Sequence, residues 1–69
     1  MDLKVFAERL RELRLDKNLN TRQLAAEISA THASLIFWEK GERMPLADSV
    51  SKLARFFGVS SDYLMGNED

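Results

Sequence analysis

The fold is decided by residues 19–45, LNTRQLAAEISATHASLIFWEKGERMP, which read as two short helices with a tight turn between them. Asn20 is placed to cap the first helix, and Gln23 three residues later completes a capping box. The apolar residues that follow recur at helical spacing and share one face. The spacing predicts a helix over residues 21–29.

A second helix is predicted after a three-residue break in this pattern. Thr31 is a suitable N-cap for it, Leu35 and Trp38 continue the apolar face, and Gly41 is placed to end it. The pattern predicts a helix over residues 32–40. Two helices joined by so short a turn form the unit that places its second helix in the major groove of DNA.

The segments on either side of this pair also show helical spacing. Apolar positions that recur every three or four residues predict three further helices, over residues 2–17, 47–57 and 61–65. Gly58 and Gly66 are placed to end the last two. No window alternates in the manner of a β-strand, so the predicted fold class is all-α, a compact five-helix domain.

The length and composition of the chain limit the number and the kind of domains that it can form. A chain of 69 residues has room for one domain, so we expect a single domain over residues 1–69, with the helix pair at about 20–40 and a short acidic tail at 66–69. The absence of cysteine excludes disulfides and thiolate metal sites. No apolar run approaches the roughly 20 residues that span a bilayer, and no signal peptide is visible. We therefore expect a cytoplasmic protein that does not contact membranes.

The sequence offers no constellation of catalytic residues. Its single histidine has no visible partner acid, nucleophile or second metal ligand, and no glycine-rich phosphate loop occurs. We therefore expect neither an enzyme nor a bound metal or cofactor, and no small-molecule effector.

The charge distribution is more informative than the formal net charge of −1. All ten Lys and Arg residues lie within positions 1–60 with eight of the eleven acids, which leaves a surplus of two positive charges there. The remaining acids, Asp62, Glu68 and Asp69, lie near the C-terminus. We expect few phosphate contacts and a weaker salt dependence than that of strongly basic DNA-binding proteins.

An ordered set of short motifs covers nearly the whole chain. They are Arg9-Leu10-Arg11-Glu12-Leu13-Arg14, Leu19-Asn20, Leu24-Ala25 with Ile28, Trp38-Glu39-Lys40-Gly41 with Pro45, Leu53-Ala54, Phe57-Gly58-Val59-Ser60 and Asp62-Tyr63-Leu64-Met65-Gly66. In this order and spacing the set resembles the Cro and lambda-repressor-type helix-turn-helix domains, the XRE family. The resemblance implies a lambda-repressor-like arrangement of five helices, with the helix-turn-helix at helices two and three.

The resemblance also implies roles for particular positions. The helix over residues 32–40 is expected to read base edges in the major groove, and Arg14 and Glu39 are expected to form a buried ion pair. The helical wheel independently places Arg14 on the core-facing edge of its helix. The chain departs from the family pattern at two positions. Ser29 stands where many members have glycine, so a left-handed backbone there would be strained, and Thr21 stands where glutamine is common and offers fewer donors.

The expected DNA contacts follow from the exposed faces of the two helices. The expected base contacts, at the N-terminal end and on the outward face of the second helix, are His32, Ala33, Ser34 and Phe37. The expected phosphate contacts are Asn20, Thr21, Arg22, Thr31, Lys40 and Arg43. Because much of the outward face is apolar, we predict A·T pairs beneath it, whose thymine methyl groups it can contact. A protein interface is the alternative for Phe37, and a solvated surface charge is the alternative for Arg22.

Several other residues have ordinary structural interpretations. Trp38 continues the Leu35 stripe and is expected in the core. The charged residues of the first helix that are expected to be solvated are Lys4, Arg9 and Arg11. The residues that can contribute to a dimer interface, or else to the core or the surface, are Val5, Leu15, Phe56, Tyr63, Leu64 and Met65, and for Leu64 we favour the core.

Two functions from different classes are compatible with these observations. The first is a small sequence-specific transcriptional regulator, a repressor that binds a palindromic double-stranded DNA operator as a homodimer. The second is a protein-interaction module of the same fold, such as an antitoxin or an anti-repressor partner. Two observations support the second function: the apolar surface formed by Ile36 and Phe37, and the slightly acidic net charge.

Overall fold

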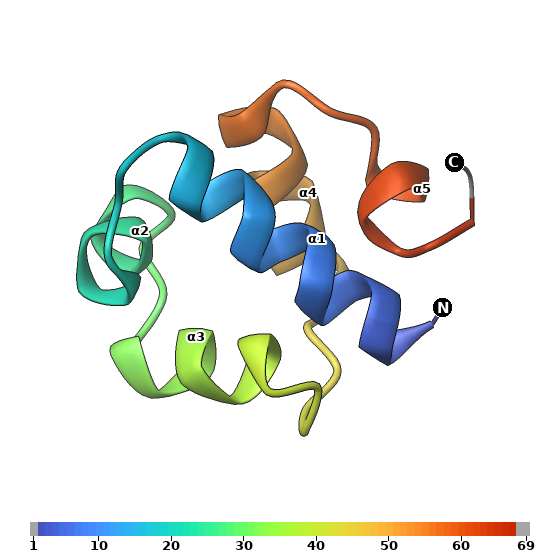
Figure 1. Cartoon of the computed structure of the whole chain (residues 1–69), viewed down its shortest axis with the longest axis horizontal. Coiled ribbons are helices and arrows are strands. Elements are labelled where there is room, and N and C mark those ends of the chain that lie inside the picture. The colour runs from blue at the N-terminus through green and yellow to red at the C-terminus, as the bar shows by residue number, and fades with distance from the viewer. Residues whose placement is uncertain (1, 68–69) are drawn as a thin grey trace.

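The computed structural model describes residues 2–67, in which five helices and no strand occur (Figure 1). The helices are α1 (Leu3–Asp16), α2 (Thr21–Glu27), α3 (His32–Glu39), α4 (Ala47–Phe57) and α5 (Ser61–Leu64). The predicted all-α class and helix order are confirmed. Only part of the predicted acidic tail lies within the described residues, since positions 68 and 69 fall outside them.

One core holds the five helices together. Six large side chains have no exposed surface, and every helix contributes at least one of them: Phe6, Leu10, Leu24, Leu35, Leu53 and Leu64. Trp38 is also buried, as predicted. Leu3, Leu13 and Phe57, which lie on the predicted apolar faces, pack only at the edge of this cluster. Burial of this apolar area is the main favourable contribution to folding of so small a domain.

The helix starts are determined locally by capping side chains. The Asn20 side chain accepts a hydrogen bond from the Gln23 amide at 2.8 Å, and the Gln23 side chain accepts one from the Asn20 amide at 2.8 Å. Thr31 and Ser60 cap α3 and α5 with a single hydrogen bond each, accepting from the backbone amides of Ser34 and Tyr63 at 3.1 and 2.9 Å. Asp2 caps α1 by accepting from two backbone amides.

The turn between α2 and α3 has a strained residue at its centre. Ser29 has a φ of 55°, and the amides of Ser29 and Ala30 bond to the carbonyl oxygens of Ala26 and Ala25 at 3.3 and 2.8 Å. This is the Schellman motif, in which glycine is the usual left-handed residue. It ends α2 at Glu27, two residues before the predicted boundary.

We expect Ser29→Gly to raise the free energy of unfolding by about 0.5–1 kcal/mol, because relief of the left-handed strain exceeds the extra entropy of the unfolded chain. The matched control is Ser51→Gly in the interior of α4, where glycine should instead lower it by about 0.5 kcal/mol. Thermal or urea unfolding of both variants measures the difference. Destabilisation by both substitutions would contradict a strained Ser29.

The two ends of the described chain are tied together, which corrects the expectation that Arg9 is only a solvated charge. The Arg9 guanidinium lies 4.2 Å from the centroid of the Tyr63 ring and donates to the Tyr63 carbonyl oxygen, so Arg9 joins α1 to α5 and is not merely a solvated charge. Val5 is half-buried, because it packs beside Gly66. The Asp2 amide donates to the Met65 carbonyl oxygen at 3.0 Å.

The other residues considered for a dimer interface divide by exposure. Leu64 has no exposed surface and belongs to the core. Phe56, Tyr63 and Met65 are half-buried. Leu15 is 52% exposed and is the most accessible of the set. Among the described residues, no helix combines the length and the apolar character needed to traverse a bilayer.

Candidate nucleic-acid interface

Helix α3 lies along one edge of the domain (Figure 1), and one of its faces packs into the core. Leu35 and Trp38 point inward and are buried. Ala33 and Lys40 are exposed, and the remaining outward side chains, including His32 and Phe37, are half-buried. The predicted reading face is therefore open at Ala33 and Lys40 and only partly covered at its other positions by the described part of the chain.

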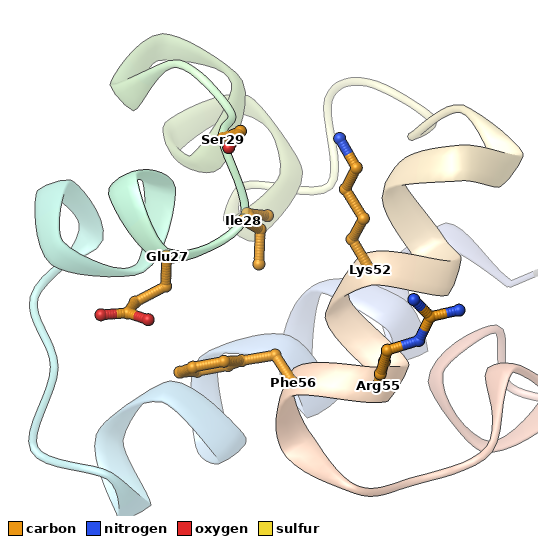
Figure 2. Close-up of a pocket in the computed structure, with 6 residues that line it drawn as sticks. All are labelled: Glu27, Ile28, Ser29, Lys52, Arg55 and Phe56. Atoms are coloured by element: carbon orange, nitrogen blue, oxygen red, sulfur yellow. The ribbon is translucent and has the colours of Figure 1, made fainter.

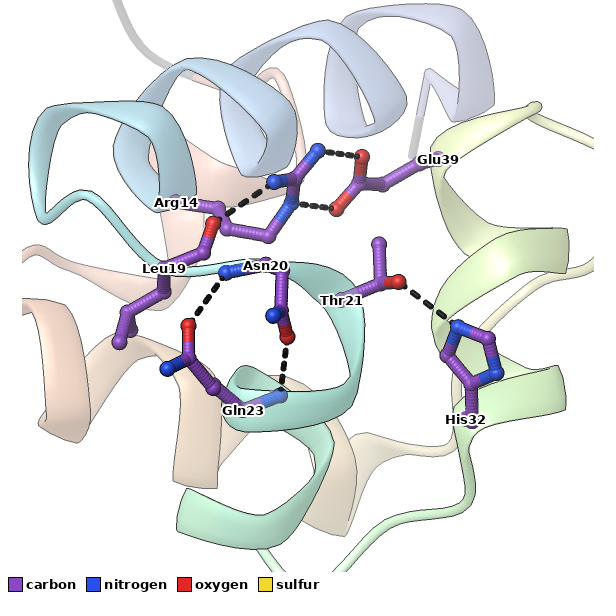
Figure 3. A network of polar contacts seen from close by, with 7 residues as sticks. All are labelled: Arg14, Leu19, Asn20, Thr21, Gln23, His32 and Glu39. Carbon is purple, nitrogen blue, oxygen red and sulfur yellow. Dashed lines mark hydrogen bonds and ion pairs between the residues drawn. The ribbon is translucent and has the colours of Figure 1, made fainter.

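The last residue of α3 is clamped to α1. Arg14 donates from Nε and Nη2 to the two carboxylate oxygens of Glu39 at 2.6 and 2.8 Å, and from Nη1 to the Leu19 carbonyl oxygen at 2.8 Å (Figure 3). Only 12% of the Arg14 side chain and 10% of the Glu39 side chain is exposed. The hydrogen bonds to Glu39 raise the pKa of Arg14 above its ordinary value. One guanidinium thus fixes α1, the segment before α2 and the end of α3.

The first residue of α3 is joined to the start of α2. The Thr21 hydroxyl and Nε2 of His32 lie 2.8 Å apart and form a hydrogen bond (Figure 3). No pattern in the sequence predicted this contact, because the two residues lie eleven positions apart on different helices. The bond joins an expected phosphate contact to an expected base contact and orients the imidazole.

Two hydroxyl groups at the start of α3 are also paired. The Thr31 hydroxyl accepts from the Ser34 amide at 3.1 Å and donates to the Ser34 hydroxyl at 2.9 Å. The proton of the Ser34 hydroxyl is not used in either bond, so Ser34 keeps one donor for a base or a phosphate.

The cations expected at phosphates are all exposed. Arg22, Lys40 and Arg43 form no ion pair within residues 2–67, so their charges remain available. Arg43 lies over the Phe37 ring, with its Cζ atom 4.5 Å from the ring centroid. Arg11, which we expected only as a solvated charge, borders a hollow of about 290 Å³ together with Thr21, Ile36 and Lys40. Arg11 is therefore an additional cation beside the helix pair, which the sequence analysis did not include among the expected DNA contacts.

A second hollow, of about 350 Å³, lies between the end of α2 and α4 (Figure 2). Ile28 and Phe56 supply its apolar surface, and Glu27, Lys52 and Arg55 carry the charges around it. It contains none of the expected DNA contacts. The part of the chain that the structure describes also holds no group of three or more His, Cys, Asp or Glu side chains placed to bind a metal ion.

Comparisons with known proteins find similarity to helix-turn-helix transcriptional regulators. A helix-turn-helix family model matches residues 10–64. The transcriptional activator BcrR of Enterococcus faecalis is 34% identical over 64 residues, which make up 93% of this chain and 31% of BcrR. The cryptic phage CTXphi transcriptional repressor RstR of Vibrio cholerae is 31% identical over 65 residues, which make up 94% of this chain and 59% of RstR.

A solved structure shows the same arrangement of helices. The restriction-modification controller protein C.AhdI of Aeromonas hydrophila superposes with a TM-score of 0.82 at 32% identity, covering 91% of this chain and 96% of the C.AhdI chain. The curated relatives are longer proteins, because the matches span only 31–59% of their lengths.

Proposed function

We propose that this chain, which belongs to the helix-turn-helix family of DNA-binding transcriptional regulators, binds double-stranded DNA. In this proposal it recognises a specific DNA sequence through α3 and thereby represses transcription. The observation that carries the proposal is the position of α3, which is open on its outer face and fixed at its first and last residues. A helix held in this way can be inserted into the major groove as a rigid unit.

The side chains of the proposed interface differ in whether they suit contacts with bases or contacts with phosphates. We propose that His32 and Ser34 form hydrogen bonds to base edges, and that Ala33 and Phe37 contact thymine methyl groups. The proposed phosphate contacts, which surround this face, are Asn20, Thr21, Arg22, Thr31, Lys40 and the added Arg11.

We further propose that two chains bind one palindromic operator. A single small domain buries a limited area on DNA, and a symmetric pair would double the contacts, with half-sites about one helical turn, roughly 34 Å, apart. The matched relatives include both an activator and a repressor, and the repressor RstR has the larger share of its length aligned to this chain. Because the target is operator DNA, we place the protein in the cytoplasm and assign it no catalytic role.

The test is a titration of the purified chain with a duplex selected from a random pool and with a scrambled duplex, between 50 and 200 mM salt. We expect tighter binding to the selected duplex, two chains per duplex, and log K that falls linearly with log salt by about 0.9 per phosphate contact. Absence of salt-dependent binding to any duplex, combined with tight binding to a protein partner, would instead support the interaction-module hypothesis.

A further inference from the structure

The end of α3 folds the following loop back onto the outer face of the helix. Gly41 has a φ of 70°, and the amides of Gly41 and Glu42 donate to the carbonyl oxygens of Trp38 and Phe37 at 3.1 and 3.0 Å. This Schellman motif reverses the chain at the last turn of the helix. It brings Arg43 over the Phe37 ring, where the guanidinium carbon lies 4.5 Å from the ring centroid.

The stack places a guanidinium on a face that otherwise lacks one. Ala33 and Phe37 lie one helical turn apart on the outward side of α3, and neither can form the paired hydrogen bonds that identify a base. An arginine can form two parallel hydrogen bonds to O6 and N7 of guanine. Arg43 therefore supplies at this face the paired hydrogen bonds to guanine that Ala33 and Phe37 cannot form.

The Arg43 side chain is available for a contact with a base and is held in place before DNA binds. It forms no ion pair within the described residues, so no carboxylate occupies its donors. The guanidinium lies over the Phe37 ring, and the attraction between a cation and an aromatic ring favours this position. The ring also restricts the side chain before DNA arrives, which reduces the entropy lost on binding.

We propose that Arg43, positioned by Phe37, is a specificity-determining residue that reads a guanine in the major groove beside the A·T pairs beneath α3. The proposal rests on the proposed function, and it differs from the phosphate contact that the sequence suggested for Arg43. Operators would then contain a G·C pair whose identity depends on a residue outside α3.

The experiment measures Kd for the wild type, Arg43→Ala and Phe37→Leu on the selected duplex and on a matched duplex with the candidate G·C pair replaced by A·T. We expect Arg43→Ala to weaken binding to the first duplex by about 10-fold and to abolish the discrimination between the two. Replacing that guanine with 7-deazaguanine, which lacks N7, should weaken the wild type and leave Arg43→Ala unchanged. Phe37→Leu, which keeps an apolar side chain but removes the ring, should reduce the guanine preference.

Lys40→Ala is the control for a phosphate contact. It should weaken binding to both duplexes by the same factor and lower the salt slope by about one. If Arg43→Ala behaves as Lys40→Ala does, or has no effect, the proposal is overturned while the proposed function stands. If the wild type binds no duplex, both proposals are overturned. Circular dichroism establishes that each variant is folded before its affinity is compared.

Discussion

Replacing Glu39 with alanine is expected to lower the free energy of unfolding by about 3 kcal/mol, because Arg14 would remain nearly buried without a counterion. We take the lower end of the range for buried ion pairs, because each side chain keeps about one tenth of its surface in water. For a domain of this size the change corresponds to a fall in Tm of roughly 12–24 °C. Differential scanning calorimetry or a thermal circular dichroism scan measures it.

Two controls separate loss of the ion pair from loss of a negative charge. Glu42→Ala removes an exposed acid three residues away and should change the free energy of unfolding by no more than about 0.5 kcal/mol. The double variant Arg14→Met with Glu39→Met should recover much of the lost stability, because no unpaired charge remains buried. A Glu39→Ala variant that melts like Glu42→Ala would show that the clamp contributes nothing to folding.

The largest effect on DNA binding is expected from Ala33→Asp. In the proposed complex the new carboxylate would face the bases and the phosphates, so affinity for the selected duplex should fall about 100-fold or more, close to 3 kcal/mol. Ala33 is exposed and lies in the first turn of α3, where a negative charge interacts favourably with the helix dipole. The fold should therefore keep its stability while binding is lost. Fluorescence anisotropy and thermal unfolding give the two measurements.

Ser51→Asp provides the matched control for this charge. Ser51 is exposed on α4, outside the proposed interface, and the substitution also adds one negative charge to a small neutral position. It should weaken binding only slightly, through the long-range potential, and this weakening should vanish as salt is raised. Equal losses of affinity in the two variants would mean that net charge, and not the outer face of α3, determines binding.

Local sequence patterns predicted the helices because the determinants are local. Capping boxes, apolar spacing and glycine positions act within a few residues, so the starts at Thr21, His32 and Ser61 follow from the sequence. The end of α2 was placed two residues too late because Ser29, unlike glycine, gives no clear signal for a left-handed turn.

Contacts between distant segments were harder to predict. The Arg14–Glu39 contact was expected because the family resemblance implied it and the helical wheel placed Arg14 inward. No pattern in the sequence indicated that Arg9 stacks on Tyr63, or that Arg43 stacks on Phe37. These contacts depend on how helices and loops are oriented in space, which residue spacing along one helix does not specify.

The anchoring of α3 at both ends has a consequence for the DNA. Because His32 is bonded to α2 and Glu39 to α1, tilting or sliding of the helix in an imperfect groove would break these contacts. In the proposed complex the duplex would supply the adjustment by bending, twisting or widening its groove, and the energy required would depend on base steps that no side chain touches. If two chains bind one palindromic operator as we propose, flexible pyrimidine–purine steps between the half-sites should improve that operator, whereas stiff A-tracts there should weaken it.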